Sequence, residues 1–344
     1  MKKPVGVIGS GSFGVAVSKL LMENVDVMLF TRRESVMNEI NNNRYYKGLD
    51  TQGKITAVND LAILGKSCDI IMPAIPSGSF RTVMKALAPH VGPEHIMIHV
   101  VKGLDISTVS NERLEKGDFS NEDIYSMSQV IRMETSVIRV GCMSGPNLAK
   151  EIMAGQPAAT VIASEFEEVI RKGQDILSSS LFTVFGSYDL KGAEIAGAFK
   201  NIIAIGSGIL GGLKMGKNMQ SALITRGLSE MIHFGSAFGA EAKSFLGTAG
   251  VGDLIATATS ESSRNYSFGM KLVEGGSTSQ IISSIGEVVE GVRTLQIVHG
   301  LARKENVKLP ITSMLYKTVH EGYDVEKAIK LLMTYNYADD VDFL

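Results

Sequence analysis

A lysine and an asparagine, Lys200 and Asn201, stand side by side in the most apolar helical stretch of the chain. The pattern over 193–213 has the helical period, and one stripe holds large apolar side chains: Ile195, Phe199, Ile202, Ile209 and Leu213. The opposite stripe holds the pair among small residues: Ala193, Gly197, Ala204, Gly208 and Gly211. Burial lowers the pKa of a lysine, which suits Lys200 to proton transfer near neutral pH. The alternative is a stripe where two helices pack closely and the lysine reaches water along its stem.

A second group of polar residues follows a glycine-dense segment over 247–252. Asp253 ends this segment, where glycines imply a close backbone turn, and a carboxylate beside a buried lysine would hold or relay its proton. Farther on, Arg264 offers a planar fork that matches a phosphate, and Asn265 adds donors. The alternative is a loop in which Asp253 and Ser263 cap helices. Together with the Lys–Asn pair, these residues favour a phosphorylated carbonyl substrate.

A glycine-rich loop opens the chain's first helical run. It follows the buried-strand pattern Val5–Ile8, precedes the helical run Val15–Met22, and consists of Gly9, Ser10, Gly11, Ser12, Phe13 and Gly14. In a GxGxxG loop the first glycine permits the tight turn, the second lets the backbone approach a pyrophosphate, and the third allows close helix packing. The helix N-terminus attracts the anion. This pattern predicts a dinucleotide site; the alternative is a glycine-rich turn without a ligand.

The next strand, predicted over Val25–Phe30, bears on the choice of cofactor. An NAD-selective site places an acidic residue at its end, whereas this chain has Arg32 and Arg33 there. Guanidinium groups suit the 2′-phosphate of NADP, so we expect NADPH to be preferred, with NADH possible. The alternative is that both arginines line a solvated loop.

Further strand and helix patterns alternate up to residue 188. Strands are predicted over 68–75, 96–101, 138–143, 158–163 and 183–186, with helices over 59–65, 80–87, 148–153 and about 165–178. Lys102 follows the strand at 96–101, at the sheet edge where open α/β sheets bind ligands. Residues 111–136 are polar and predict a surface excursion with one short helix.

The pattern changes abruptly at residues 188–192. From Gly192 onward the periodic segments are helical, apart from a Gly-, Ser- and Thr-rich stretch near 246–265. With 344 residues, two domains are expected. We therefore predict an α/β fold: a Rossmann-type doubly wound sheet over 1–190 and an all-α substrate domain over 191–344.

Composition excludes several classes of function. The net charge is −2 and no basic stripe occurs, which argues against nucleic acid or an anionic membrane as main partners. Cys68 and Cys142 lie in apolar runs and predict core residues in a reducing compartment, with no metal site. The start of the chain does not resemble a signal peptide, and the stretch over 195–213 contains a lysine, so we expect a buried helix in a cytoplasmic protein.

Seven segments of the chain resemble one family, the bacterial-type glycerol-3-phosphate dehydrogenases. They are GSGSFG (9–14), VVKGL (100–104), SGPNLAKE (144–151), EIAGAFKNIIAIGSGI (194–209), NMQSALITRGLSEM (218–231), GVGDLIATATSESSRN (250–265) and VVEG (288–291). The segment at 250–265 matches the family pattern at all but one position. The resemblance implies interconversion of dihydroxyacetone phosphate and sn-glycerol 3-phosphate with NAD(P)H. It also implies a role in supplying glycerophospholipid synthesis.

The same resemblance implies roles for individual residues. Lys200 is similar to the family's proton acceptor in alcohol oxidation, and Lys102 to a residue shared by substrate and nicotinamide. Together with these two lysines and Asn201, the implied substrate set is Gly145, Asn147, Asp253, Ser263, Arg264 and Asn265. The implied cofactor set is the loop at 9–14, Arg32, Arg33, Lys102, Ala149, Arg264, Val288 and Glu290. The last two lie in Glu287–Gly291, whose acids alone indicate only a solvated helix start.

Two departures and two rivals accompany this interpretation. Asn147 stands where the family usually has Thr or Ser, and the excursion near 115–136 is longer than usual. A related hydroxyacid or ketoacid reductase could use Arg264 for a carboxylate. A non-catalytic NADPH sensor would have no need of Lys200 or Asp253. Small-residue helix faces are compatible with a homodimer.

Overall fold

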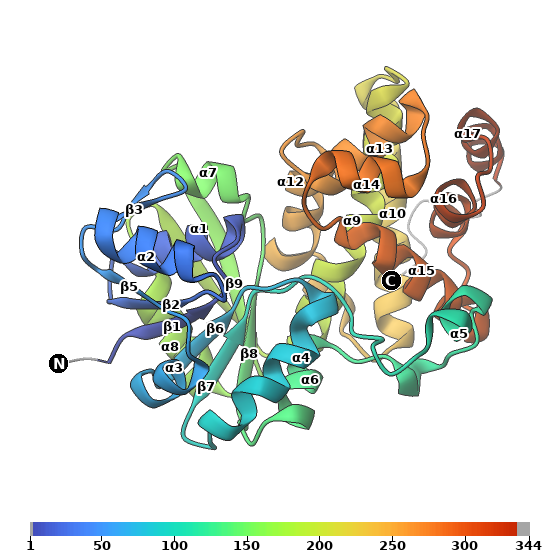
Figure 1. Cartoon of the computed structure of the whole chain (residues 1–344). Helices are drawn as coiled ribbons and strands as arrows, with labels where there is room; N and C mark the ends of the chain where they lie inside the picture. Colours follow the sequence, from blue (N-terminus) through green and yellow to red (C-terminus); the bar gives the residue numbers. More distant parts are fainter. Residues whose placement is uncertain (1–2, 336–344) are drawn as a thin grey trace. The chain divides into compact units, whose positions relative to one another are not determined.

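The computed structural model describes residues 3–335, which form two compact units (Figure 1). Within these residues, the sheet unit consists of 3–101 and 125–190, and the helical unit of 102–124 and 191–335. A single boundary at residue 190 therefore misses one segment, because Lys102–Ile124 packs with the helical unit. The cause is apolar burial: the Phe119 ring is 1% exposed and lies against Gly300, where a Cβ would come within 2.3 Å of it.

The sheet unit is built on eight strands in the order β10-β9-β8-β7-β6-β1-β2-β5. The six strands at one end of this order, β8, β7, β6, β1, β2 and β5, are parallel to one another. Strand β9 pairs antiparallel with β8 and parallel with β10. The parallel part has the Rossmann strand order 3-2-1-4-5-6. The strands are β1 Val5–Ile8, β2 Val27–Phe30, β5 Ile55–Val58, β6 Ile70–Pro73, β7 Ile96–His99, β8 Arg139–Ser144, β9 Ala158–Ser164 and β10 Phe182–Ser187.

Helices cover both faces of this sheet, because successive strand residues point to opposite sides. Val7 packs in one apolar cluster with α1, α2 and α8, and its neighbour Ile8 packs in another with α3, α4 and α6. The predicted doubly wound fold is thus confirmed. The helices are α1 Ser12–Leu21, α2 Glu34–Asn43, α3 Leu61–Ser67, α4 Ser77–Leu87, α6 Met127–Glu134, α7 Ala149–Met153 and α8 Glu167–Leu177, with a 3-10 turn at Ala88–His90.

Two parts of the sheet unit differ from the sequence prediction. Residues 34–58 hold a helix, a two-stranded hairpin (β3 Tyr45–Tyr46, β4 Leu49–Asp50) and β5, none of which was predicted. Residues 111–136 are not a surface excursion with one helix. They contain α5 Asn111–Lys116, a 3-10 turn at Asn121–Asp123 and α6, whose Val130 and Ile131 are fully buried. Ser126 and Gln129 begin α6 as a reciprocal capping box.

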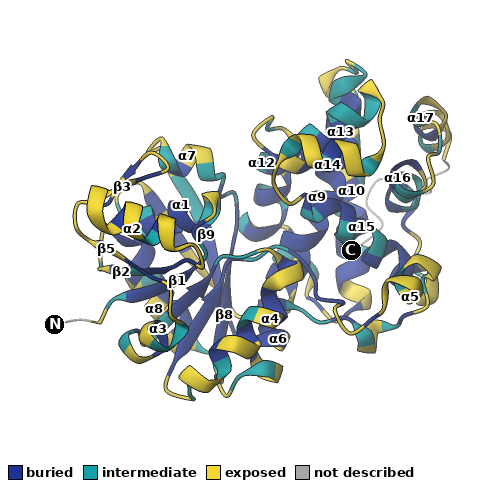
Figure 2. Ribbon diagram, viewed as in Figure 1, coloured by how far each residue is buried: buried dark blue, intermediate teal, exposed yellow. Residues whose placement is uncertain are grey.

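The helical unit surrounds one long helix, α9 Leu190–Gly212, which is buried along its length (Figure 2). Among the described residues it alone is long and apolar enough to cross a membrane, but 89% of its most apolar window is buried inside the protein, as in a core helix. The other helices are α10 Lys217–Ala237, α11 Ala242–Phe245, α12 Asp253–Ala258, α13 Arg264–Glu274, α14 Thr278–Ile285, α15 Glu290–Lys304, α16 Pro310–His320 and α17 Val325–Met333.

The small-residue stripe of α9 is a close helix contact. A Cβ at Gly208 would lie 2.0 Å from the carbonyl oxygen of Tyr266 on α13, and one at Gly211 would lie 2.3 Å from the Tyr266 hydroxyl. The close-packing alternative is therefore right for the glycines. It does not remove the lysine from the core, because Lys200 is 5% exposed. The stretch near 246–265, expected to be irregular, contains a π-helical turn at Thr248–Gly252 followed by α12.

Candidate active site

Two lysines of the helical unit share one buried carboxylate. Lys102 Nζ lies 2.6 Å from Asp253 Oδ2, and Lys200 Nζ donates to Asp253 Oδ1. Lys200 Nζ also donates to the Thr257 hydroxyl at 2.6 Å. Asp253 is 1% exposed, while the Lys102 side chain retains 16% exposure. We call this group the lysine–aspartate centre: Lys102, Lys200, Asp253 and Thr257.

The pKa of Lys200 is set by opposing effects. Burial lowers it to about 7, the Asp253 carboxylate raises it, and the positive charge of Lys102 lowers it further. The effect of burial on the pKa outweighs that of Asp253, because one carboxylate is shared between two amines and neutralises Lys200 only in part. An amine with a pKa near neutrality can give up and take back a proton at physiological pH.

The backbone that carries Asp253 depends on glycines. In the π-helical turn, a Cβ at Gly250 would lie 2.1 Å from the carbonyl oxygen of Phe245, so only glycine permits this close turn. Asp253 is the first residue of α12 and its side chain does not cap the helix, so the capping alternative fails for it. It holds for Ser263, whose hydroxyl accepts a bond from the Tyr266 N–H and caps α13.

An amide chain connects this centre to the start of α15. Asn201 Nδ2 donates to the Lys102 carbonyl at 3.2 Å, and Asn265 Nδ2 donates to Asn201 Oδ1 at 2.8 Å. The N–H of Gly291 completes the chain by donating to Asn265 Oδ1 at 2.9 Å. A Cβ at Gly291 would lie 2.7 Å from that same oxygen, which explains the glycine.

The predicted phosphate anchor lies at the surface of the helical unit. Arg264 Nη1 is 3.0 Å from Glu287 Oε2, and both side chains are nearly half exposed. Val288 is 47% exposed and Glu290 is the first residue of α15. The segment Glu287–Gly291 therefore contacts two members of the predicted substrate set, Arg264 through an ion pair and Asn265 through a backbone N–H.

The glycine loop of the sheet unit has the geometry that a dinucleotide requires. Gly9 has φ +121°, and a Cβ at Gly14 would lie 1.9 Å from the Gly9 carbonyl oxygen. At Gly11, a Cβ would meet nothing within 4 Å, so the backbone there is open to a ligand. Helix α1 begins directly after it, and Ser12 is exposed while Phe13 is half-buried. The residues present thus fit a pyrophosphate at this helix N-terminus.

The arginines after β2 have a tyrosine partner that the sequence did not reveal. Arg32 and Arg33 are both exposed, and Arg33 Nη2 donates to the Tyr46 hydroxyl at 3.2 Å. Tyr46, in the hairpin, in turn donates to the Ser10 carbonyl at 3.4 Å. The Ser10 hydroxyl donates to Thr31 Oγ1 at 2.9 Å. These bonds link the glycine loop to the end of β2.

The remaining predicted residues follow β8 in the sheet unit. Gly145 has φ +147°, and a Cβ there would lie 3.0 Å from the Thr160 Cα, so the turn requires glycine. Asn147 Nδ2 donates to Thr160 Oγ1 at 2.8 Å, while its buried Oδ1 has no hydrogen-bond partner among the described residues. Ala149 is the first residue of α7.

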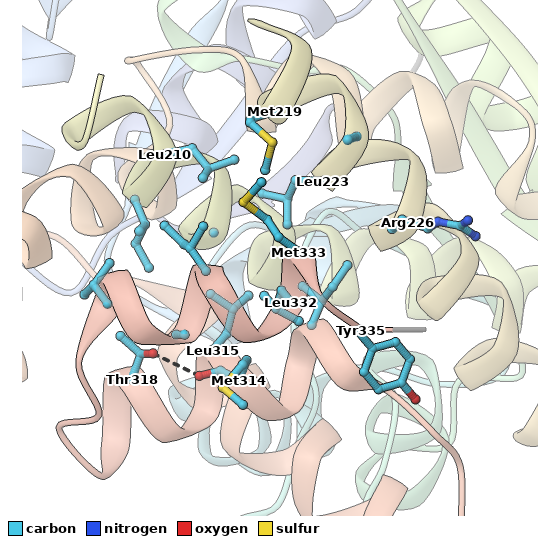
Figure 3. Close-up of a pocket in the computed structure, with 17 residues that line it drawn as sticks. Leu210, Met219, Leu223, Arg226, Met314, Leu315, Thr318, Leu332, Met333 and Tyr335 are labelled. Atoms are coloured by element: carbon cyan, nitrogen blue, oxygen red, sulfur yellow. Dashed lines mark hydrogen bonds between the residues drawn. The ribbon is translucent and has the colours of Figure 1, made fainter. Parts of the chain in front are cut away.

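A large groove lies elsewhere in the helical unit, with a volume of about 360 Å³ (Figure 3). It is lined by residues of α9, α10, α16 and α17 and by Tyr335, and Arg226 is the one charged residue among them. Its lining contains none of the predicted site residues. An apolar groove does not suit a small phosphorylated substrate, so the lysine–aspartate centre is the better candidate for chemistry.

A Rossmann sheet with a dinucleotide loop and a helical unit with a buried lysine of near-neutral pKa define a class, the nicotinamide-dependent oxidoreductases. Family models narrow this class. Residues 4–170 match the N-terminal model of NAD-dependent glycerol-3-phosphate dehydrogenase, and residues 189–330 match its C-terminal model. The chain belongs to the NAD-dependent glycerol-3-phosphate dehydrogenase family.

Individual relatives agree with the family models. Glycerol-3-phosphate dehydrogenase [NAD(P)+] of Acinetobacter baylyi is 39% identical, over 99% of this chain and 92% of its own length. The enzyme of the same name from Saccharophagus degradans is 36% identical over the same shares. The crystal structure of glycerol-3-phosphate dehydrogenase from Coxiella burnetii superposes with a TM-score of 0.87 at 30% identity, covering 97% of this chain and 99% of that one.

Proposed function

We propose that this protein interconverts dihydroxyacetone phosphate and sn-glycerol 3-phosphate with NAD(P)H. The observation that carries the proposal is the buried lysine–aspartate centre, in which two amines share the Asp253 carboxylate. A carbonyl reduction needs positive charge where the alkoxide develops and a proton donor for the oxygen. Lys102 and Lys200 supply the first, and the near-neutral pKa of Lys200 supplies the second.

The chemistry of the step follows from these groups. A nicotinamide, when bound, supplies the hydride to the ketone carbon. As negative charge develops on the oxygen, the ammonium groups of Lys102 and Lys200 stabilise it. Lys200 then gives its proton to that oxygen and becomes a neutral amine, and in alcohol oxidation it accepts the proton back. Asp253 and Thr257 hold the Lys200 Nζ in place for both directions.

Other residues would bind the substrate rather than exchange its proton. Asn201, a member of the implied substrate set, donates through its Nδ2 to the Lys102 and Gly197 carbonyls, which supports a role in fixing the Lys102 backbone. Arg264 is half exposed and presents a fork for the phosphate, with Asn265 and Ser263 beside it in sequence. Gly145 and Asn147 are further substrate candidates; the free Oδ1 of Asn147 can accept a bond from a hydroxyl.

The cofactor proposal rests on the loop at residues 9–14 and on the two arginines after β2. Arg33 is held by Tyr46, which also bonds to the glycine loop. A guanidinium near this loop would pair with the 2′-phosphate on the adenosine ribose of NADPH, so we propose that NADPH is preferred to NADH. Further cofactor positions are proposed for Lys102, Ala149, Arg264, Val288 and Glu290. A homodimer is proposed on the small-residue helix faces and a cytoplasmic location on the sequence pattern. A role in glycerophospholipid supply is proposed on the family resemblance.

The test is the initial rate of cofactor oxidation with dihydroxyacetone phosphate, measured with NADPH and with NADH at equal concentrations. Fast turnover with NADPH preferred supports the proposed reaction and the proposed cofactor preference. Fast turnover with NADH preferred supports the reaction but rejects the role of Arg32 and Arg33 in selecting NADPH. Because a carboxylate could also pair with Arg264, a panel of ketoacids is run beside it. Turnover of a ketoacid without turnover of the phosphorylated ketone would establish the rival reductase.

A further inference from the structure

We propose that Gln220 is a positioning residue for the lysine–aspartate centre, acting through the end of helix α12. The proposal rests on the proposed function, since it concerns the geometry around Lys200. Gln220 lies on α10, is 6% exposed, and does not contact the centre itself. Its amide donates to the Ser207 hydroxyl at 2.8 Å and to the Ala258 carbonyl at 3.2 Å.

The orientation of the Gln220 amide follows from its partners. Lys217 Nζ donates to Gln220 Oε1 at 2.8 Å, and an ammonium can only donate. The Ala258 carbonyl can only accept, so the other end of the amide must be the nitrogen. The Ser207 hydroxyl, which is also buried, donates to the same carbonyl. Two side chains from two different helices thus converge on one backbone oxygen.

That oxygen belongs to the helix that carries the Lys200 partners. Helix α12 has 6 residues, and an isolated helix of this length does not hold its shape in water. Asp253 at its start and Thr257 near its end both contact Lys200 Nζ. Ala258 directly follows Thr257, and its carbonyl is one of the terminal groups that find no partner within the helix.

Helix α9 contacts α12 at both ends through one face. Lys200 and Ser207 are seven positions apart, close to two turns, so they project from the same side of α9. Lys200 meets Asp253 and Thr257, and Ser207 meets the Ala258 carbonyl. Gln220 adds a contact from α10 at the second of these points. Without it, the end of α12 that holds Thr257 loses one of its two side-chain donors.

The experiment compares wild type with Gln220→Met, which keeps the length of the side chain and removes the donor. We expect kcat for dihydroxyacetone phosphate reduction to fall at least ~10-fold while KM stays within about threefold, because placement of the proton donor is disturbed and substrate binding is not. The pH midpoint of kcat moves to lower pH. Thr257 donates to Asp253 Oδ1 at 3.3 Å, so a displaced Thr257 holds that carboxylate less well, and Asp253 raises the Lys200 pKa against the opposing charge of Lys102.

Two further variants make the comparison specific. Thr225→Ala lies on the exposed face of the same helix and removes a hydroxyl that bonds only to the Ser221 carbonyl, so kcat and its midpoint stay at wild-type values. Ser207→Ala removes the other donor to Ala258 and shifts both quantities in the same direction as Gln220→Met. If Gln220→Met does not fold, Gln220→Ala, which also removes the donor without adding a charge, and Ser207→Ala decide the question.

A folded Gln220→Met protein with wild-type kcat and midpoint would overturn the proposal, as would a rise in KM without loss of kcat. Failure of the proposed function itself is recognised separately, by absence of wild-type turnover. In that case the Lys200 Nζ is titrated by NMR in ¹⁵N-lysine protein, with its signal assigned from Lys200→Met. A titration midpoint of Lys200 that is lowered in Gln220→Met supports the positioning role of Gln220, and an unchanged midpoint rejects it.

Discussion

Lys200 Nζ donates to Asp253 Oδ1 across 53 positions of sequence, and the same carboxylate accepts from Lys102 at 2.6 Å. This sharing leaves a buried site with two amines and one acid. Such a site has surplus positive charge, which favours the binding and formation of oxyanions. It also keeps Lys200 close to the point of losing its proton, since burial opposes the ammonium form.

The first prediction concerns the pH dependence of the two directions of reaction. Ketone reduction requires protonated Lys200, so its kcat falls as pH rises through about 7; alcohol oxidation requires the neutral amine, so its kcat rises through the same range. Steady-state rates of both directions between pH 5.5 and 9 test this. Profiles that change in the same sense for both directions would rule out a single proton-exchanging amine.

A second prediction concerns Arg264. Arg264→Ala should raise KM for dihydroxyacetone phosphate at least ~10-fold and leave KM for unphosphorylated dihydroxyacetone nearly unchanged, because only the phosphate pairs with the guanidinium. Glu287→Gln is the matched control: it removes the present partner of Arg264, and KM for the phosphorylated ketone should not rise. Equal losses of affinity for both ketones would reject the anchor role.

The third prediction concerns the cofactor. Arg33→Ser should lower the ratio of kcat/KM for NADPH over NADH at least ~10-fold, since one charge-assisted pair with the 2′-phosphate is removed. Tyr46→Phe keeps the ring but removes the hydroxyl that holds Arg33, and should lower the ratio by a smaller factor. Kinetics with both cofactors measure it; a ratio that neither variant changes would mean that the arginine is a surface residue.

Sequence patterns point to individual candidate residues more readily than to the contacts that those residues make. The glycine loop and the Lys–Asn pair are local signals, because a tight turn and a polar residue within an apolar helix appear in a few consecutive positions. Thr257, Tyr46 and Gly291 were missed since their roles arise from partners far away in sequence: Lys200, Arg33 and Asn265. A glycine directly after the acids at 287–290 was the one available signal for Gly291.

The fold shows the same division between local and long-range information. Alternation of strands and helices predicted the Rossmann sheet, but β5 consists of four residues, Ile55–Val58, whose place at the sheet edge is set by pairing with β2. Helix α6 was hidden in a polar stretch because only one of its faces is buried, against the sheet unit. Single-sequence periodicity over eight residues is a weak signal for such a helix.

A fourth prediction concerns stability rather than catalysis. The buried Glu230 carboxylate on α10 accepts bonds from the Ile311 N–H and from the Thr312 N–H and hydroxyl at the start of α16. Burial, which outweighs these donors, raises the pKa of Glu230 from 4.5 to about 7. The folded state therefore binds this proton more tightly than the unfolded state, and the contribution of Glu230 to stability is lost as pH rises from about 4.5 to about 7.

Glu230→Gln removes this titration. The free energy of unfolding of wild type relative to the variant should thus fall between pH 4.5 and pH 7.5, by an amount on the order of 3 kcal/mol for a shift of this size. Urea titrations followed by circular dichroism at several pH values measure the difference. If the difference stays constant or increases with pH, the carboxylate does not titrate in this range.

The most direct measurement is kcat for NADPH-dependent reduction of dihydroxyacetone phosphate by Lys200→Met beside wild type. Methionine fills the space of the lysine stem without an amine, and NADPH binding, followed by fluorescence, serves as the control for an intact sheet unit. We expect a loss in kcat of at least ~10² with NADPH affinity retained, because the proton donor is gone. A folded variant that turns over at nearly the wild-type rate would contradict the central role of Lys200.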